Sequence, residues 1–424
     1  MRAGSEFDVV TAVRAAGRRG LTLRAVGTGH SFNRLACSDG VLLDLSRMRG
    51  VLGLDPVRRT VTVRAGTTIG ELSRVLESAG LALPNVGTLD EQTVGGAMAT
   101  GNHGTGLAFG PFATTVSSLR LVVANGDVVT CSAEDDAELF AAARTSLGAL
   151  GVVTAATLNC VPAFNLRVSH ESLALDAMLD ELPRWAGSAE HPSASWSPWR
   201  REATVRLVRR TAASGTRGAR WQRYRTTMAE FGCGVAGVVG PRSPAAGLLL
   251  AKQLPPRRAP ADYVDGSHHV FTFPQPVRFV ALEHALALEA VAPALRELRR
   301  ALERTSLHSP YSVLLRVGAA DDAPLSPAFG RTTGYVNLTV PRHPRYTELL
   351  RVVESVMRAH DGRPHWGKAH TADADVLAPR YPKWSAFAQL RRRLDPKGLF
   401  TSEYLRHLLG PVDAAEWLAT EVIG

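Results

Sequence analysis

Arg24-Ala25-Val26-Gly27-Thr28-Gly29-His30-Ser31-Phe32-Asn33 is the most informative stretch of the sequence. It completes a β-rich run that begins at Leu21, and two glycines and a histidine follow that run directly. Because glycine tolerates positive φ angles, such a loop lets backbone N–H groups converge on an anion. The pattern indicates a cofactor that carries a pyrophosphate and a reactive group close to His30.

Length and composition are those of a globular protein with one large domain or two to three packed domains. The chain has 424 residues, of which 45% are hydrophobic and 21% are charged, and these values are ordinary for globular folds. No run of about 18 apolar residues occurs, so we expect no membrane-spanning helix. The first eight residues lack the apolar core of a signal peptide.

The charged and sulfur-containing residues argue against several classes of partner. The net charge is +10, but the basic residues are mostly scattered arginines. Their two clusters, Arg209-Arg210 and 391–393, lack the interleaved aromatic residues of single-strand nucleic-acid sites. The four cysteines form no CxxC pair, which disfavours zinc and redox-dithiol sites. We therefore expect no nucleic acid, no membrane and no metal, and a reduced, cytoplasmic protein.

Hydrophobic periodicity predicts an α+β fold rather than regular βαβ repetition. Ser5 is a candidate N-cap, and Asn125-Gly126 predicts a type I′ hairpin turn. The expected strands are 21–26, 41–45, 51–55, 60–65, 119–124, 127–131, 152–158 and 203–208. The expected helices are 5–19, 68–79, 134–144 and 291–304, with a loop at 232–261 and a helical tail over 384–424.

Three glycine-bearing segments lie in the first 155 residues, at 27–33, 95–106 and 146–151. None is a dinucleotide fingerprint, because no GxGxxG opens a long helix between parallel strands, and no Walker lysine is present. Any one of them alone is most often a turn. Their combination, in this order and with these neighbours, is far more specific.

These segments belong to a longer pattern that is known from one family. The matching stretches are 27–33, 85–96, 100–106, 320–327 with Gly330-Arg331, 363–368 and 394–400. They span nearly the whole chain. Together they resemble the covalent-flavin oxidoreductases of the vanillyl-alcohol-oxidase superfamily, in particular its sugar-lactone (arabinono- and gulono-lactone) and alditol oxidases.

The resemblance implies three parts of the chain. Residues 1–163 would form an FAD-binding domain of the PCMH type with two α+β subdomains, and residues 164–370 a substrate or cap domain with an antiparallel sheet flanked by helices. Residues 371–424 would return to the FAD domain. The family usually has a further strand before the first helix, whereas this sequence begins almost at that helix. Either the sequence starts late or the protein has lost the strand, and its loss would leave a sheet edge exposed.

The resemblance also implies FAD as cofactor, bonded covalently through His30. A neutral imidazole nitrogen is nucleophilic near pH 7, which suits that bond. The alternative is a hydrogen-bonded loop histidine beside a non-covalent flavin. The other expected cofactor-binding residues are Gly27, Thr28, Gly29, Ser31, Phe32, Gly87, Thr88, Gly95, Gly96, Thr100, Gly101, His103, Gly104, Gly148, Gly151, Val153 and Lys368.

Substrate-pocket positions of the family are matched by Arg316, Lys368, Thr88, Thr339 and Asn337, which we expect to be catalytic. An arginine and a lysine near the flavin would stabilise the reduced anion and an alkoxide-like substrate oxygen. The lysine stands out because the chain otherwise prefers arginine. Three histidines are candidate acid–base groups or structural residues, namely His103, His365 and His370.

The expected reaction is hydride transfer from a carbinol C–H to flavin N5, with O₂ reduced to H₂O₂. In the family, a gatekeeper residue lies beside the C4a–N5 edge of the flavin, where glycine accompanies fast reaction with O₂ and alanine accompanies dehydrogenase behaviour. Gly87 matches this position and therefore favours an oxidase. The chain departs from the alditol oxidases at two pocket positions, where they carry a glutamate and a histidine and this chain carries Leu314 and Asn337. The identity of the substrate therefore stays undetermined. The substrate would be a polyol, a sugar lactone, or a sugar-containing metabolite such as a glycoside or nucleoside.

Three alternatives remain. One is a dehydrogenase of the same fold with a quinone or cytochrome acceptor. Another is an enzyme that oxidises a lipid-linked or nucleotide-linked sugar, against which the Gly-His-Ser-Phe-Asn motif argues. The last is a non-catalytic binding protein in which Leu314 and Asn337 mark the loss of activity.

Overall fold

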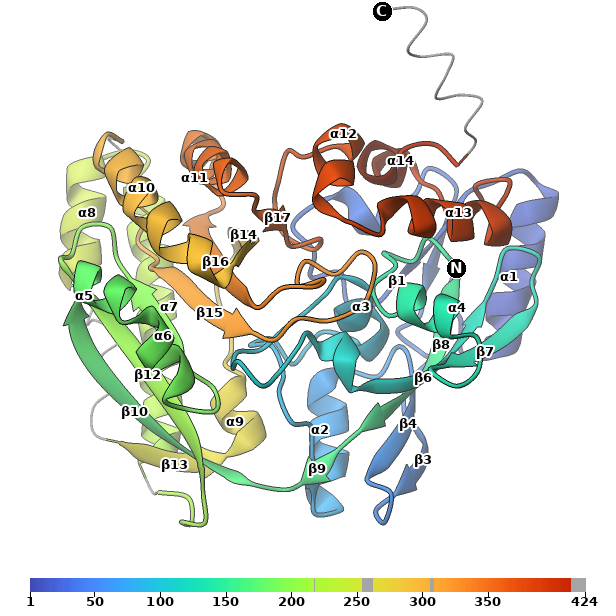
Figure 1. Ribbon diagram of the computed structural model, residues 1–424, viewed down its shortest axis with the longest axis horizontal. Coiled ribbons are helices and arrows are strands. Elements are labelled where there is room, and N and C mark those ends of the chain that lie inside the picture. The colour runs from blue at the N-terminus through green and yellow to red at the C-terminus, as the bar shows by residue number, and fades with distance from the viewer. Residues whose placement is uncertain (217, 254–261, 306–308, 413–424) are drawn as a thin grey trace, which may run out of the picture.

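The chain folds into two lobes that meet along a central seam (Figure 1). The computed structural model describes all residues except 217, 254–261, 306–308 and 413–424. Strands and helices are mixed in both lobes, and the larger sheets are antiparallel, so the predicted α+β class is confirmed.

The chain begins along the edge of a small parallel sheet. Strand β1 (Leu23–Val26) pairs with β2 (Val41–Asp44), and the amide of Ala3 donates to the carbonyl of Asp44 at 2.9 Å. Residues 1–3 therefore cover part of the edge that we expected to be exposed. Helix α1 (Glu6–Arg18) follows, and its capping box joins Ser5 to Asp8 as predicted.

A five-stranded antiparallel sheet forms the centre of the first lobe, in the order β3-β4-β8-β6-β7. Its strands are β3 (Val51–Asp55), β4 (Thr60–Arg64), β8 (Val152–Asn159), β6 (Val116–Val122) and β7 (Val128–Ser132). The lobe also holds α2 (Ile69–Ser78), α3 (Val94–Ala99), α4 (Ala137–Ala143) and the short pair β5 (Leu81–Ala82) and β9 (Val161–Pro162). The predicted hairpin between β6 and β7 is present, but its type I′ turn is wrong. Only Gly126 has a positive φ, of 84°, because the Asn125 side chain accepts from Asp127 N and holds a different turn.

An eight-stranded antiparallel sheet forms the second lobe, in the order β13-β10-β12-β11-β15-β16-β14-β17. Its strands are β10 (Asn165–Ala174), β11 (Ser193–Trp196), β12 (Glu202–Thr211), β13 (Tyr263–Gly266), β14 (Phe279–Ala287), β15 (Val313–Gly318), β16 (Thr333–Pro341) and β17 (Arg363–Pro364). Its helices are α5 (Leu175–Asp180), α6 (Leu182–Gly187), α9 (Ser267–Phe271), α10 (Val291–Glu303) and α11 (Thr347–Ala359). Apolar side chains on one face of the sheet, such as Leu282, Leu315 and Leu338, form a core with α5, α6, α10 and α11. The alternating side chains point to the other face, toward the seam between the lobes.

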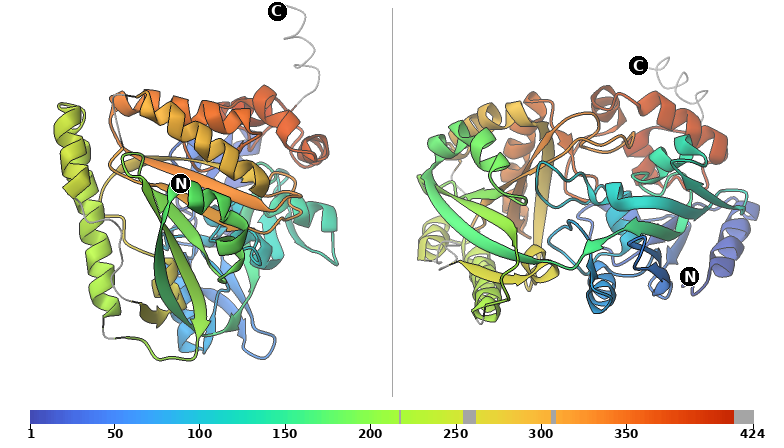
Figure 2. Two further views of the ribbon diagram at one scale, coloured as in Figure 1. Left: turned by 60° about the vertical axis from the view of Figure 1, so that its left-hand side comes forward. Right: turned by 60° about the horizontal axis from the view of Figure 1, so that its bottom comes forward.

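The predicted loop at 232–261 is wrong where the structure describes it. Helices α7 (Ala219–Val239) and α8 (Pro244–Gln253) occupy this region and form a yellow-green column at the edge of the second lobe (Figure 2). Its glycines allow close packing rather than turns: a Cβ on Gly237 would lie 2.4 Å from Cγ of Pro341. Residues 254–261 lie outside the described part of the chain.

The C-terminal segment returns to the first lobe (Figure 1). It carries α12 (Ala374–Leu377), α13 (Trp384–Leu394) and α14 (Glu403–Leu409). Leu399 and Phe400 join the hydrophobic core beneath α1, and the carbonyl of Leu399 accepts from Leu23 N at 2.7 Å. The helical tail is thus confirmed as far as Leu409, while 413–424 lie outside the described residues. Within the described ranges, no helix is both long and apolar enough to cross a bilayer.

Candidate active site

Three cavities run from the glycine loop to the inner face of the eight-stranded sheet. We call them the loop cavity, the central cavity and the cap cavity. Gly29, His30 and Thr100 line both the loop cavity and the central cavity. Thr88 and Arg316 line both the central cavity and the cap cavity. A single path therefore crosses the seam between the lobes.

The loop cavity gathers the three glycine segments that the sequence singled out. Gly29 has a φ of 71°, and a Cβ on Gly27 would lie 2.2 Å from Oγ1 of Thr93, so a side chain there would collide with the facing loop. The predicted residues that line this cavity are Gly27, Thr28, Gly29, His30, Ser31, Gly95, Gly96, Thr100, Gly148, Gly151 and Val153. The wall is rich in glycine, whose exposed backbone N–H groups suit the pyrophosphate of an extended dinucleotide such as FAD.

The buried side chain of Arg24 holds the loop cavity together, and sequence reasoning missed it. Its guanidinium donates to the carbonyls of Leu35, Leu147, Gly148 and Phe400 at 2.5–3.3 Å. These carbonyls come from three distant segments of the chain. Burial, with a smaller contribution from another arginine, lowers the pKa of Arg24 to about 10, so the side chain stays cationic at neutral pH.

His30 lies where the loop cavity meets the central cavity. It is half-buried, and its Nε2 is 3.8 Å from Oε2 of Glu91. Burial lowers the pKa of His30, although the Glu91 carboxylate opposes the shift. The imidazole is therefore mainly neutral at pH 7, the form in which a ring nitrogen is nucleophilic.

The glycine loop also positions the lysine that faces it. Asn33 Nδ2 donates to the carbonyls of Trp366 and Lys368 at 2.8 and 2.9 Å, and Phe32 N donates to Gly367 O at 2.8 Å. The ammonium of Lys368 lies 5.0 Å from the centre of the Phe32 ring. The predicted residues that line the central cavity include Phe32, Gly87, Thr88, His103, Arg316 and Lys368.

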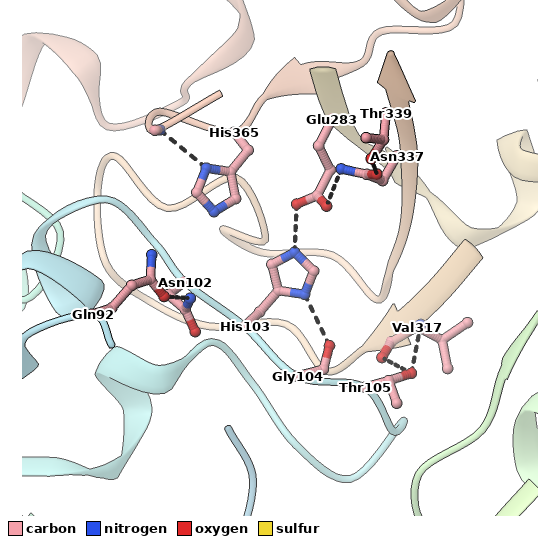
Figure 3. A network of polar contacts seen from close by, with 11 residues as sticks. Gln92, Asn102, His103, Gly104, Thr105, Glu283, Val317, Asn337, Thr339 and His365 are labelled. Atoms are coloured by element: carbon pink, nitrogen blue, oxygen red, sulfur yellow. Dashed lines mark hydrogen bonds and ion pairs between the residues drawn. The ribbon is translucent and has the colours of Figure 1, made fainter. Parts of the chain in front are cut away.

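Glu283 on β14 is the centre of a polar network that the sequence did not reveal (Figure 3). Its Oε1 is 2.7 Å from Nε2 of His103, and its Oε2 accepts from Nδ2 of Asn337 at 3.2 Å. Asn337 Oδ1 in turn accepts from Oγ1 of Thr339 at 3.2 Å. The only signal in the sequence is one glutamate within the apolar run 279–287.

Burial and charge fix the protonation of this network. Burial alone would raise the pKa of Glu283, but His103, His365 and Lys368 outweigh it and hold that pKa well below its usual range. Burial lowers the pKa of Lys368, although Glu283 opposes the shift, and it lowers the pKa of His365 to about 3. The central cavity thus contains an ionised carboxylate, a neutral His365 and a lysine that loses its proton more readily than usual.

Some predicted residues lie away from the central cavity. Asn337 and Thr339 contact it through Glu283, and Gly104 lines the cap cavity instead. Gly101, with a φ of 70°, packs against Pro327. His370 is half-buried, and burial lowers its pKa to about 4.

The hydrogen bonding of one buried side chain also fits FAD. Asn102 lines the central cavity, and its buried Oδ1 has no hydrogen-bond partner in the described part of the chain. Its Nδ2 is held by Gln92 at 2.5 Å, which aligns the amide. A buried, unpaired acceptor at this position needs a donor, such as an N–H group of a bound ring.

Comparison with known proteins also indicates an FAD-binding protein. Residues 1–132 match the family of FAD binding domains, and residues 156–408 match the family described as D-arabinono-1,4-lactone oxidase. The L-gulono-1,4-lactone dehydrogenase of Mycobacterium tuberculosis is 35% identical over 97% of this chain and 96% of its own. The L-gulonolactone oxidase of Bos taurus is 33% identical over 90% and 88%.

Solved structures support the fold. Cholesterol oxidase from B. sterolicum superposes with a TM-score of 0.75 at 18% identity, over 96% of this chain and 93% of its own. The predicted resemblance is confirmed, and the chain belongs to the D-arabinono-1,4-lactone oxidase family of FAD-dependent oxidoreductases, within the vanillyl-alcohol-oxidase superfamily.

Proposed function

We propose that this protein oxidises a CH–OH group of a polyol, a sugar lactone or a sugar-containing metabolite, with FAD as cofactor and O₂ as acceptor. The observation that carries the proposal is the continuous path from the loop cavity to the polar wall of the central cavity, with His30 at the junction. When bound, the flavin supplies the redox chemistry by accepting a hydride and passing two electrons to O₂, which leaves as H₂O₂.

The residues of the chain bind and orient the substrate in this proposal. We assign Thr88, Arg316, Asn337, Thr339 and Lys368 to the substrate side. Arg316 stays cationic and stabilises negative charge on the reacting oxygen. The Lys368 amine, with its lowered pKa, takes the proton of the hydroxyl, and Glu283 sets the field around it.

We further propose that His30 bonds FAD covalently. The proposal is supported by its position between the two cavities and by the lowered pKa that keeps the imidazole neutral. The glycine segments and Thr28, Ser31 and Val153 would hold the rest of the cofactor. A covalent bond predicts that yellow colour stays with the protein after acid precipitation, whereas a non-covalent flavin would appear in the supernatant.

A dehydrogenase is the second candidate, because the relative from Mycobacterium tuberculosis is named a dehydrogenase. We favour the oxidase because Gly87 leaves the central cavity open beside Thr88. Anaerobic reduction by substrate followed by mixing with air separates the two: fast reoxidation with stoichiometric H₂O₂ supports the oxidase, and slow reoxidation supports the dehydrogenase.

We also propose the division into domains at 1–163, 164–370 and 371–424, which follows the two sheets and the return of the C-terminal helices. A cytoplasmic location is supported by the free thiols of Cys37, Cys131, Cys160 and Cys233. A peroxide-coupled screen of polyols, aldonolactones and glycosides tests the activity itself.

A further inference from the structure

The cap cavity is lined by positive and neutral groups alone. Among the residues that the structure describes, no aspartate or glutamate lines it. Its basic side chains are Arg206, Arg223, Arg225, Arg316, His170, His191 and His269. A concentration of buried or half-buried arginines without carboxylates is costly unless a ligand supplies the opposite charge.

Two of these arginines lie on one row of the sheet, together with His170. His170 lies opposite Arg206 across β10 and β12, Arg206 lies opposite Ser193 across β12 and β11, and Ser193 lies opposite Arg316 across β11 and β15. Residues directly opposite each other in antiparallel strands project from the same face. Arg206 and Arg316 are therefore separated by one strand and point into the same cavity.

Helix α7 closes the cavity from the other side with two more arginines. Arg223 pairs with Asp265, so its charge is compensated. The side chain of Arg225 forms no hydrogen bond or ion pair with any described residue. Among the described residues, the side chain of Arg206 donates only to the backbone carbonyl of Val270, at 3.0 Å, and pairs with no carboxylate.

A buried histidine in the cap cavity indicates that the ligand also carries a hydroxyl group. His191 is 1% exposed, and its Nδ1 donates to the carbonyl of Thr105 at 3.1 Å. Burial, weakly opposed by that hydrogen bond and supported by Arg210 and Arg206, lowers its pKa to about 4, so the ring is neutral. Its Nε2 is then an acceptor with no partner among the described residues, and a hydroxyl group of a ligand would satisfy it.

Leu314, where alditol oxidases carry a glutamate, lies in the wall of the same cavity. Leu314 lines it, one position along the strand face from Arg316. A glutamate there, as in alditol oxidases, would place a negative charge among the arginines. Leucine removes that charge, and the cavity is left free to take an anion from a ligand.

We propose that the cap cavity binds an anionic group, a carboxylate or a phosphate, of a polyhydroxylated substrate whose reacting CH–OH group lies in the central cavity. The inference rests on the proposed function, since it extends the same substrate from one cavity into the next through Thr88 and Arg316. Arg206 and Arg225 bind the charged end, and His191 accepts from a neighbouring hydroxyl.

The test compares substrates that differ only in charge, with the FAD-loaded protein and an artificial electron acceptor. Sorbitol is paired with sorbitol 6-phosphate and with gluconate, so that the two charged compounds distinguish phosphate from carboxylate. We expect kcat/KM to be at least about tenfold higher for one charged compound, as for one added charge-assisted hydrogen bond. A preference for sorbitol over both charged compounds would overturn the proposal.

Variants then assign the preference to the cavity. Arg225→Gln should reduce the charged-to-neutral ratio of kcat/KM by about tenfold, and Arg225→Lys should retain most of it. Arg242→Gln is the matched control, because Arg242 lies at the exposed turn after α7 and, within the described part of the chain, its side chain donates only to Val238 O. An unchanged ratio in Arg225→Gln, or an equal loss in Arg242→Gln, would refute the assignment.

Calorimetric titration of the FAD-loaded protein with inorganic phosphate and with gluconate separates this inference from the proposed function. We expect one of the two to bind the unaltered protein and to bind Arg206→Gln at least about tenfold more weakly. If no hydroxyl compound is oxidised but this binding is observed, the proposed function fails and the anion site stands. If neither anion binds, the anion site fails whatever the activity.

Discussion

Replacement of Glu283 tests whether the central network depends on a buried charge. His103 Nδ1 donates to Gly104 O at 2.9 Å, and Nε2 lies 2.7 Å from the carboxylate. Because both partners are acceptors, both ring nitrogens carry protons and the two side chains form an ion pair, exposed by only 2% and 5%. Removing one partner of such a pair costs about 3–5 kcal/mol, so Glu283→Ala should lose that much unfolding free energy.

The amide variant should behave differently. Glu283→Gln can donate to Nε2 of a singly protonated His103 while its oxygen still accepts from Asn337, so the network stays hydrogen-bonded without charge. We therefore expect a loss of only about 1–2 kcal/mol. Urea unfolding of the FAD-loaded proteins at pH 7 measures both variants. The FAD affinity of each variant is measured alongside, because bound cofactor stabilises the native state by an amount that depends on its dissociation constant.

The pH dependence has a defined sign. The folded pKa of Glu283 lies well below its usual range, so its contribution is complete above the unfolded pKa of about 4.3 and is lost as pH falls through the folded value. The difference between the unaltered protein and Glu283→Gln should shrink below about pH 4. Glu138→Gln, at an exposed pair with Arg393, should cost about 0–1 kcal/mol. A loss below about 1 kcal/mol in Glu283→Ala would refute the reasoning.

Four further substitutions address the cofactor and the substrate. His30→Ala should release flavin on acid precipitation, and retention of colour in the pellet would rule out the bond. Gly87→Ala would place a Cβ 2.5 Å from Oδ1 of Asn102, so stopped-flow mixing with air should show slower reoxidation than in the unaltered protein. Arg24→Met should lower the melting temperature and weaken FAD retention, because four carbonyls lose their donor; an unchanged melting temperature would contradict this. Leu314→Glu should reverse the preference for anionic substrates, measured as the ratio of kcat/KM.

Local sequence patterns were enough to predict most elements of the first lobe. The capping box at Ser5 and the alternation in 60–65 report local backbone preferences and one buried face, and both signals survive in the fold. The loop predicted at 232–261 failed because its glycines were interpreted as turn residues. In the structure, Gly237 packs α7 against Pro341, a tertiary reason that no local pattern contains.

In the candidate site, too, some residues could be recognised from the sequence and others could not. The glycine loop and His30 are contiguous in sequence, so their motif could be recognised directly. Glu283 contacts His103, which is 180 residues away in the sequence and lies in the loop after α3. Arg206 lies opposite His170 across β10 and β12, so both pairs of neighbours meet only in the folded chain. Arg24 was visible in the opening motif, but its role depends on carbonyls from segments that meet only in the folded chain.

Oxidation of a CH–OH group by this protein with FAD can be observed on the flavin itself. The most direct measurement is anaerobic addition of polyols, aldonolactones and their anionic counterparts to the FAD-loaded protein while its visible flavin absorbance is recorded. We expect bleaching by at least one of these compounds and recovery of colour in air with formation of one H₂O₂ per flavin. A protein that binds FAD but is bleached by none of them would contradict it.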